Sequence, residues 1–351
     1  MNRLSQIKLS IIIATFNREK RLKKSLPLLL SEDSDQFEFI IIDNNSSDKT
    51  QQLVSSFSKN DNRIRYFKNH SNIGANRNYY RGYLEAKSNW ICFMSDDDFI
   101  QHGFLSELIQ IIDKNQDCGL IINSNDNSGD LNLTQSRRIK SGIDALKLSF
   151  KLSGVLTGLT INKKLIKQEY WTLDNSIYPQ ISLASNLSLK NDLYINIPKN
   201  KIIIGKEDTI NFIISNRPLD LGIFERLEIL LQVSNNLNNN QRLKFINSLS
   251  VTLFNWAINT SKEMYSVNKN YSLFFLKNLM KNSFIKSSIS FHVILIIKYI
   301  FNKKINLIIK ITIGLHILKS LFLSIFNKNL YQSLYYTAYN FNNKKLKNLK
   351  T

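Results

Sequence analysis

The chain has 351 residues, which is enough for one large domain or two smaller ones with a sizeable core. Its only two cysteines, Cys92 and Cys118, exclude a disulfide-stabilised scaffold and favour a reducing compartment. The formal net charge is +20, and residues 231–351 hold 17 Lys and Arg against one acid, Glu263, so a nearly neutral front part precedes a strongly basic tail.

The N-terminal part alternates apolar runs with helix-forming stretches. Residues 8–15 form a continuous apolar run, which is typical of a strand buried on both faces of a parallel sheet. Residues 19–30 favour a helix and residues 37–42 a second strand. Asp48 is placed to cap a fourth element, a helix over residues 49–58. The first residues lack the layout of a secretion signal, so we expect a cytoplasmic protein.

The same alternation continues toward the centre of the chain. Residues 63–67 predict a weaker strand, and a polar stretch that begins at Asn72 leads into a helix ending near Lys87. Residues 90–95 predict the next strand. Strands are also expected at 119–123 and 156–161 and as a closing pair at 194–197 and 201–204, with a helix at 181–189. This order implies a doubly wound α/β domain with a mostly parallel sheet, flanking helices and right-handed crossovers.

Three consecutive carboxylates, Asp96, Asp97 and Asp98, follow the strand at 90–95 directly. Adjacent acids repel one another and need a counter-charge when they are buried. On an extended backbone Asp96 and Asp98 share one side, and Asp97 faces the other. Mg²⁺ and Mn²⁺ suit such a pair, because they take one or two carboxylates and complete their shell with water and phosphate oxygens. The alternative is a solvated acidic turn.

Polar side chains follow several of the expected parallel strands at their carboxyl ends, where doubly wound sheets bind ligands. Thr15 and Asn17 follow the first strand, Asp43 the second, and the acid triplet the fourth. The sequence therefore predicts a site with a hydrogen-bond acceptor at Asp43 and a separate metal-binding cluster. A glycine loop of the Walker or dinucleotide type is missing after the first strand, which disfavours ordinary NTPases and NAD enzymes.

Four motifs in this order resemble the family 2 glycosyltransferases of GT-A fold. They are residues 10–18 (SIIIATFNR), 40–50 (IIIDNNSSDKT), 72–74 (NIG) with Arg77 and Asn78, and the acidic cluster. The Ser-Asp-Asp-Asp form of the cluster is similar to the bacterial abequosyltransferase-like branch. The resemblance covers residues 7–215.

The resemblance implies a nucleotide-sugar donor and a hexosyl- or deoxyhexosyltransferase that depends on Mn²⁺ or Mg²⁺. It implies that Thr15 contacts the nucleotide, that Asp43 binds the base and that Arg77 faces the diphosphate. The metal would be held by Asp96 and Asp98. The full set of expected donor contacts is Thr15, Asn17, Arg18, Asp43, Asn72, Arg77, Asn78, Asp96 and Asp97.

The reaction also needs a base on the acceptor side, because the attacking sugar hydroxyl must lose a proton. The usual Glu-Asp pair of the family is absent near residues 178–181. Asp174 is the nearest substitute and is the expected catalytic residue, with a plain surface acid as the alternative. Further candidates for the base are Asp192, Glu207 and Asp208. His102 is a candidate third metal or phosphate ligand, or an ordinary loop histidine.

The two parts of the chain predict a catalytic domain over residues 1–217 and a basic, mainly helical region over 218–351. Residues 305–326 place apolar side chains on one helical arc, with exceptions, and are too often interrupted by charge for a membrane span. This helix is expected either in the interface of an anionic membrane or in a helical bundle on the catalytic domain.

The leading hypothesis is a glycosyltransferase that adds a sugar to a growing glycan, carried on a lipid, in bacterial surface polysaccharide (O-antigen or capsule) synthesis. Such an enzyme would be cytoplasmic or peripheral on the cytoplasmic face of the inner membrane. Two alternatives are a non-catalytic GT-A-like scaffold and a nucleic-acid-binding protein that uses the basic tail, although no recognition motif supports nucleic acid. A nucleotidyltransferase also uses paired acids at strand ends.

Overall fold

The computed structural model of the protein describes residues 7–124, 135–171, 176, 178–205, 226, 229–230, 232–242, 245 and 249. The chain divides into two compact units, Met1–Asn211 and Phe212–Thr351. The boundary expected after residue 217 lies outside the described residues and stays a prediction.

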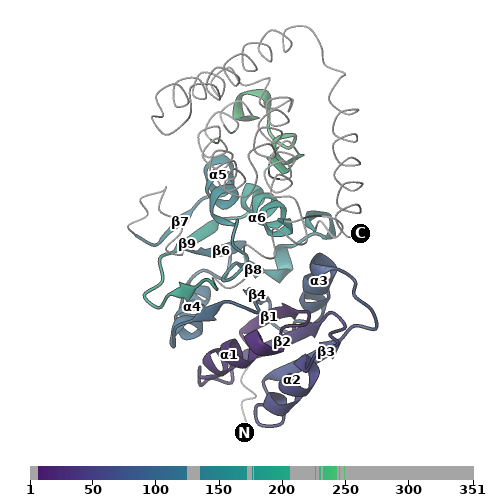
Figure 1. Ribbon diagram of the computed structural model, residues 1–351. Helices are drawn as coiled ribbons and strands as arrows, with labels where there is room; N and C mark the ends of the chain where they lie inside the picture. Colours follow the sequence, from purple (N-terminus) through teal and green to yellow (C-terminus); the bar gives the residue numbers. More distant parts are fainter. Residues whose placement is uncertain are drawn as a thin grey trace, which may run out of the picture. The chain divides into compact units, whose positions relative to one another are not determined.

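The first unit is built on one large sheet (Figure 1). Its strands are β1 (Leu9–Thr15), β2 (Phe37–Asp43), β3 (Ile64–Lys68), β4 (Trp90–Ser95), β6 (Leu120–Asn123), β7 (Arg137–Ile139), β8 (Thr160–Asn162) and β9 (Leu193–Asn196). Across the sheet they follow the order β3-β2-β1-β4-β8-β6-β9-β7. A separate ribbon pairs β5 (Phe99–Ile100) with β10 (Ile202–Ile203).

The four neighbouring strands from β3 to β4 are all parallel, as the apolar runs predict. In this register Thr15 lies opposite Asp43, and Ala14 lies opposite Ser95. The carboxyl ends of the three central strands therefore meet at one edge. Beyond β4 the sheet is mixed, because β8 runs antiparallel to both β4 and β6.

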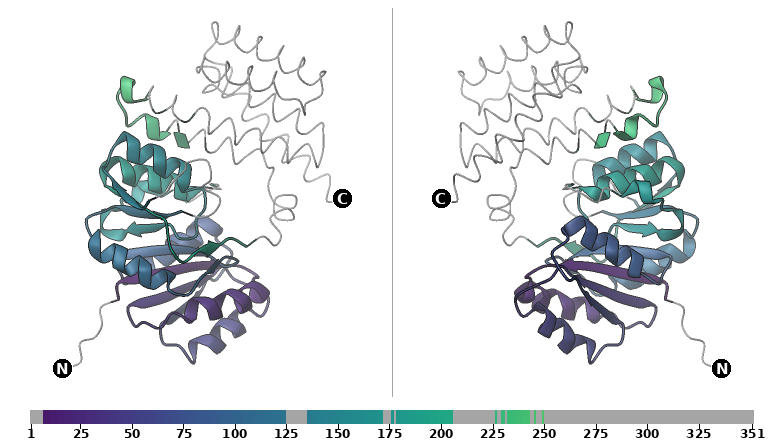
Figure 2. Two further views of the ribbon diagram at one scale, coloured as in Figure 1. Left: turned by 90° about the vertical axis from the view of Figure 1, so that its left-hand side faces the viewer. Right: turned by 90° about the vertical axis from the view of Figure 1, so that its right-hand side faces the viewer.

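Helices cover both faces of this sheet, as a doubly wound fold requires (Figure 2). One apolar core contains side chains from α1 (Glu19–Leu30), α2 (Thr50–Ser58) and α4 (Phe104–Lys114). The core on the other face contains side chains from α3 (Ala75–Glu85), α5 (Ile143–Leu152) and α6 (Pro179–Lys190). Two 3₁₀ turns, η2 (Lys163–Leu165) and η3 (Gln168–Tyr170), connect β8 to the segment before α6.

The last two strands of the unit differ from the expectation of a closing pair. β9 lies between β6 and β7, whereas β10 pairs with β5 beside the acid triplet. Two short apolar runs separated by a few residues resemble a hairpin in sequence. The prediction was wrong because these runs find their partners in segments far away in the chain.

The described residues of the second unit are largely helical. The Asn-rich stretch breaks the helix at residues 235–237, and a new helical turn starts after Asn238. Asn238 accepts from the backbone N–H of Gln241, and Gln241 accepts from that of Asn238, which is a reciprocal cap. The expected interfacial helix at 305–326 lies outside the described residues. No helix among the residues that the structure describes is long and apolar enough to cross a membrane.

Candidate functional site

The acid triplet, Asp96 to Asp98, forms a tight turn between β4 and β5 and is not extended. We call this segment the acid turn. The expectation that Asp96 and Asp98 share one side of a strand was therefore wrong. The three carboxylates are instead directed to three different sets of partners. This separation reduces their mutual repulsion.

Asp96 is turned toward the end of β1. Its Oδ2 accepts from the hydroxyl of Thr15 at 2.8 Å, and its Oδ1 lies 4.0 Å from Nε of Arg18. The residue is only 8% exposed. Burial raises the pKa of Asp96 to about 6, although the hydrogen bond from Thr15 and the charge of Arg18 oppose this shift. The structure thus brings together three residues that the sequence predicts for donor binding.

Asp97 is held away from Asp96 by α1. Its Oδ2 lies 2.5 Å from Nη1 of Arg21, and its Oδ1 accepts from the hydroxyl of Ser95 at 2.5 Å. An arginine at this distance compensates the carboxylate charge. Asp97 is therefore part of the support of the turn.

Asp98 is 4% exposed and contacts two segments that follow much later in the chain. Its Oδ2 accepts from the hydroxyl of Thr157, and its Oδ1 accepts from the backbone N–H of Gly205 at 2.8 Å. Burial raises the pKa of Asp98, and these two hydrogen bonds oppose the rise. Among the described residues, no ion pair compensates this carboxylate.

The loops after β1 and β2 are joined beside the acid turn. Asn17 has a left-handed φ of 54°, and its side-chain oxygen accepts from the N–H of Ser47 at 2.8 Å. Its own N–H donates to the hydroxyl of Ser46 at 2.8 Å. An Asn tolerates this backbone region better than most residues. Asn17 therefore fixes the loop that carries Arg18.

Asp43 is fully buried at the end of β2. Its Oδ1 accepts from the N–H of Ser46 at 2.7 Å, and its Oδ2 accepts from the hydroxyl of Tyr66 at 2.6 Å. Burial and the carboxylate of Asp43 raise the pKa of Tyr66, so Tyr66 remains a donor. This arrangement gives Asp43 a positioning role. The predicted contact with a base stays a prediction, and each oxygen of Asp43 keeps a second lone-pair direction for it.

A network of amide side chains holds the loop between β3 and α3. Asn72 accepts from Asn44 at 2.7 Å, and Asn69 donates to Asn44 at 3.0 Å and to Asn78 at 2.8 Å. Asn78 is 2% exposed and donates to the carbonyl of Ile42 at 2.8 Å. We therefore expect Asn78 to support the donor loop from behind.

Arg77 is exposed in the first turn of α3, next to Asn78. The motif that starts at Asn72 and ends at Asn78 thus follows the end of β3 and forms the start of α3. The role of Arg77 toward a diphosphate stays a prediction.

The acceptor side is less completely described. Asp174, Glu207 and Asp208 lie outside the described residues, so their expected role as base stays a prediction. Asp192 is engaged by Arg138 at 2.8 Å and by Lys140 at 3.0 Å, which lower its pKa together with the N–H of Ser141 against the effect of burial. Asp192 is therefore a structural acid of the sheet edge.

The donor set of the acid turn fits a hard divalent cation. Among the described residues no three His, Cys, Asp or Glu side chains form a metal-ligating group, so exposed His102 adds no third ligand. Asp96 and Asp98 nevertheless offer two buried carboxylates with raised pKa, each held by a hydroxyl. Mg²⁺ and Mn²⁺ often use one or two carboxylates together with phosphate oxygens and water. Such a site would be completed by a diphosphate.

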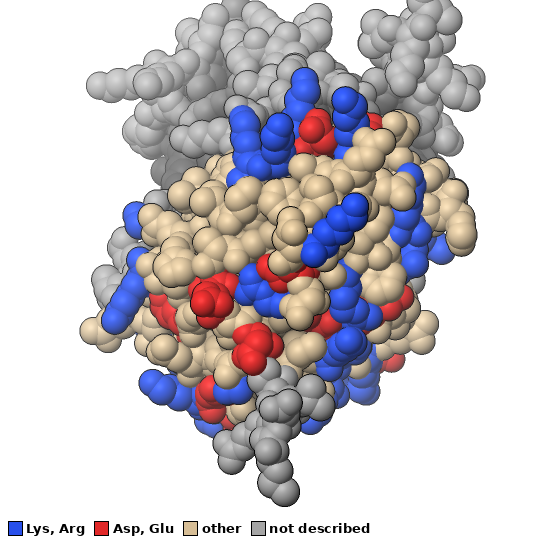
Figure 3. Space-filling view, turned by 90° about the horizontal axis from the view of Figure 1, so that it is seen from below, with Lys and Arg blue, Asp and Glu red and all other residues tan. Residues whose placement is uncertain are grey.

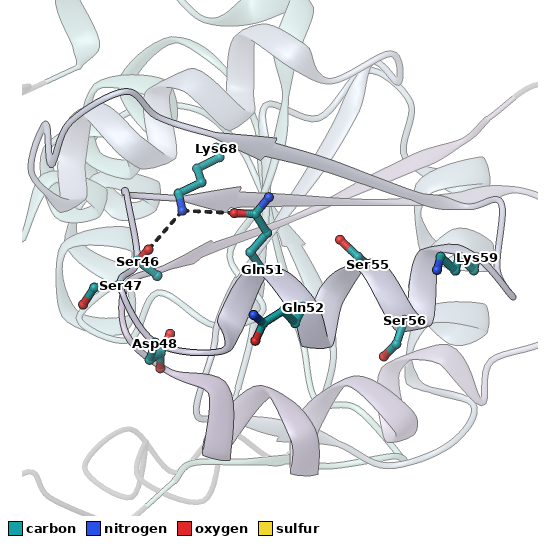
Figure 4. A pocket seen from close by; sticks show the side chains of 9 residues that line it. All are labelled: Ser46, Ser47, Asp48, Gln51, Gln52, Ser55, Ser56, Lys59 and Lys68. Atoms are coloured by element: carbon teal, nitrogen blue, oxygen red, sulfur yellow. Dashed lines mark hydrogen bonds between the residues drawn. The ribbon is translucent and has the colours of Figure 1, made fainter.

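A hollow of about 740 Å³ lies along α2, next to the loop after β2 (Figure 4). Its lining consists of Ser46, Ser47, Asp48, Gln51, Gln52, Ser55, Ser56, Lys59 and Lys68. Lys68 reaches from β3 toward α2 and donates to the carbonyl of Ser46 at 3.0 Å and to Gln51 at 3.1 Å. The hollow shares Ser46 and Ser47 with the site but is not lined by Asp96, Asp97 or Asp98.

Several supporting residues were missed by sequence reasoning. They are Arg21, Asn44, Tyr66, Thr157 and Gly205. Arg21 lies one helical turn after the predicted Asn17-Arg18 pair, which is a usable signal. Thr157 directly precedes Gly158, whose φ of 84° is a left-handed conformation that favours glycine.

Comparison with known proteins gives one family. The family model described as "Glycosyl transferase family 2" matches residues 10–170. Over 104 residues the chain is 39% identical to the GalNAc(5)-diNAcBac-PP-undecaprenol beta-1,3-glucosyltransferase of Campylobacter jejuni. This match covers 29% of this chain and 34% of that protein. Over 102 residues it is 26% identical to the putative glycosyltransferase EpsH of Bacillus subtilis, which covers 29% of each chain. The matches thus span no more than about a third of these relatives.

Solved structures extend the likeness in fold beyond that segment. S. aureus TarS 1-349 in complex with UDP-GlcNAc has a TM-score of 0.62 at 14% identity, with 90% of this chain and 89% of that chain covered. A second S. aureus TarS structure has a TM-score of 0.51 at 18% identity and covers 69% of this chain and 43% of that chain. At such identities the likeness shows the fold, and it confirms the expected GT-A architecture.

Proposed function

We propose that the chain, whose residues 10–170 match the model of glycosyltransferase family 2, transfers a sugar from a nucleotide-sugar donor to a glycan acceptor. The observation that carries the proposal is the acid turn after β4. Its buried carboxylates Asp96 and Asp98 lie where the carboxyl ends of the parallel strands β1, β2 and β4 meet. Ligands of doubly wound sheets bind at that edge.

We assign the donor site to the loops at this edge. Arg18 faces the acid turn and Arg77 lies in the first turn of α3, so both guanidinium groups are candidates for contact with the diphosphate. Thr15 and Asn17 set the position of the turn and of the first loop. Asn72 and Asn78 hold the third loop in place.

Asp96 and Asp98 would hold Mn²⁺ or Mg²⁺ together with the donor diphosphate. The bound cation would stabilise the negative charge that develops on the departing nucleoside diphosphate. The residues of this chain contribute two buried carboxylates, each of which already accepts a hydrogen bond from a threonine hydroxyl before the donor arrives. Asp174 is our candidate for the base that takes the proton of the acceptor hydroxyl.

The acceptor is proposed to be a lipid-linked glycan of a bacterial surface polysaccharide. This rests on the relative from C. jejuni, whose name specifies an undecaprenol diphosphate-linked acceptor. The transferred sugar would be a hexose or deoxyhexose. A lipid-linked acceptor would place the protein in the cytoplasm or at the inner face of the membrane, where the basic tail would meet anionic lipid.

The alternatives have less support. The face of the described part that Figure 3 shows carries both acidic and basic side chains, whereas a nucleic-acid-binding surface is dominated by Lys and Arg. A non-catalytic scaffold would not need two carboxylates whose burial makes their ionisation unfavourable. Both alternatives stay hypotheses.

The test is turnover with a panel of UDP-, GDP-, CDP- and dTDP-sugars, Mn²⁺ and lipid-linked acceptors, read as released nucleoside diphosphate. Asp98→Ala should abolish turnover. Asp144→Ala removes an acid of α5 that is 78% exposed and pairs with nearby Lys147, so it should leave turnover unchanged. Metal-dependent nucleotide binding without turnover under any pairing would favour the scaffold.

A further inference from the structure

Asp98 lies where three segments that are distant in sequence come together. The first is the acid turn itself, the second is the turn before β8, and the third is the chain that leaves β10. Each of the last two donates one hydrogen bond to a different oxygen of the Asp98 carboxylate. The residues that donate are 59 and 107 positions away from Asp98.

We propose that Thr157 and Gly205 are positioning residues that fix the orientation of the metal-binding carboxylate of Asp98. This inference rests on the proposed function. It extends the functional unit of the site beyond the motif-bearing segment, to Gly205, which lies two residues after β10 and outside the matched residues 10–170.

The hydroxyl of Thr157 can donate in one direction only. Its Oγ1 accepts from the backbone N–H of Ser95 at 2.9 Å, and its proton goes to Asp98. Thr157 is 3% exposed, so water does not compete for these bonds. The N–H at the end of β4 therefore orients the hydroxyl, and the hydroxyl orients the carboxylate.

Gly205 makes the second bond with its backbone, and its lack of a side chain is required. A Cβ at Gly205 would lie 2.3 Å from the carbonyl oxygen of Asp97, which is far inside normal contact distance. The glycine can approach because β10 pairs with β5, with Ile202 opposite Ile100 and Ile203 opposite Phe99. The acid turn and the ribbon thus pack backbone against backbone.

The two supporting segments also contact each other. A Cβ at Gly158 would lie 2.3 Å from Cδ1 of Ile202, so the turn that carries Thr157 packs directly on β10. A shift of the ribbon would therefore disturb both donors to Asp98. Each donor occupies one lone-pair direction of its oxygen and leaves the other for a cation. Residues of this kind commonly change metal affinity about 10–100-fold when they are replaced.

The experiment measures the Mn²⁺ concentration that gives half-maximal thermal stabilisation of the full chain, with UDP, GDP, CDP and dTDP tested in parallel. Thr157→Val should raise that concentration about 10–100-fold, and Thr157→Ser, which keeps the hydroxyl, should stay near wild type. Thr160→Val is the matched control. Thr160 is also buried, three residues later, but its hydroxyl donates to the carbonyl of Gly158 at 3.1 Å.

Gly205→Ala should weaken the Mn²⁺ response in the same way. Its control is Gly119→Ala, where a Cβ would lie 2.5 Å from Cβ of Asn191, away from the acid turn. Both alanine variants should lower the melting temperature, but only Gly205→Ala should shift the Mn²⁺ requirement.

Two outcomes would overturn the proposal in different ways. If the wild type responds to Mn²⁺ and nucleotide while Thr157→Val and Gly205→Ala behave like their controls, the positioning role is wrong and the proposed function stands. If the wild type shows no metal-dependent response to any nucleotide, both the proposed function and the inference that rests on it fail.

Discussion

The hydroxyl of Thr15, at the end of β1, donates a 2.8 Å hydrogen bond to the carboxylate of Asp96, at the start of the turn after β4. The two strands are neighbours in the sheet, so a contact across 81 residues of sequence is set by strand pairing. This bond joins the first motif of the chain to its acid cluster.

Replacing Thr15 should shift the pH dependence of the site. Thr15→Val removes a donor that holds the pKa of Asp96 down, so the pH midpoint of Mn²⁺-dependent nucleotide binding should rise by about one unit. Thr15→Ser keeps the donor and should restore the wild-type midpoint. Titration of binding between pH 5 and 8 tests this, and equal midpoints for Val and wild type would contradict it.

The stability of the metal-free protein should fall as pH rises through the titration of Asp96. This is the opposite of the effect of an ordinary salt-bridged acid. Because burial raises the pKa of Asp96 from 3.8 to about 6, ionisation of this group opposes folding. Its contribution to stability is therefore present below pH 4 and is lost as pH rises to about 6. We expect Asp96→Asn to flatten this part of the melting-temperature profile between pH 4 and 7.

Metal and nucleotide should reverse that loss. A cation on Asp96 and Asp98 binds the ionised carboxylates, so protons compete with it below about pH 6. Mn²⁺ with a nucleoside diphosphate should raise the melting temperature at pH 7.5 and much less at pH 5. The comparison is made with EDTA at both pH values, and equal gains at both would argue against carboxylate ligands.

Arg21 and Asp97 should depend on each other for stability. The pair is partly buried, with side chains 13% and 28% exposed, so Arg21→Met should leave Asp97 uncompensated at a cost of about 1–2 kcal/mol of unfolding free energy. The double variant with Asp97→Asn should recover part of this loss. Urea unfolding of both single variants and the double variant measures the coupling, and strict additivity would mean that the pair does not support the turn.

Asn78 should act on stability more than on chemistry. Asn78→Ala leaves the carbonyl of Ile42 and the amide of Asn69 without these partners, which should cost about 2–3 kcal/mol. Exposed Asn60, whose amide donates to the carbonyl of Ser56, is the control, and Asn60→Ala should cost under about 0.5 kcal/mol. Urea unfolding decides between the two. Loss of nucleotide affinity in Asn78→Ala without loss of stability would instead indicate direct donor contact.

The sequence was informative where structure is determined locally. Apolar runs of strand length such as residues 8–15 predicted the parallel strands, because burial on both faces leaves a continuous pattern in the sequence. The motif residues Thr15, Arg18 and Asp96 were also correctly brought together, since strand ends in a doubly wound sheet converge. Asp48 was expected to cap a helix over residues 49–58; the helix begins at Thr50 with Lys49 as its N-cap residue, and Asp48, one position earlier, accepts from the N–H of Thr50 at 3.0 Å.

The sequence did not predict contacts whose partners are determined by tertiary packing. Thr157 and Gly205 support Asp98 from segments that carry no motif of their own, and their position follows from how β8 and β10 pack. The prediction of where the three carboxylates point was wrong for the same reason. The backbone forms a tight turn there instead of the extended strand that was assumed. The sequence predicted Asp43 as a free acceptor, whereas in the structure its two oxygens already accept hydrogen bonds from Tyr66 and Ser46.

The most direct test of the central claim is calorimetric titration of the full chain with UDP, GDP, CDP and dTDP, with and without Mn²⁺, for the wild type and Asp98→Ala. The account predicts that one of these nucleotides binds the wild type only when Mn²⁺ is present, and that Asp98→Ala abolishes this binding. Binding that is indifferent to metal and to Asp98, or no binding of any nucleotide, would contradict the assignment of the acid turn as a donor site.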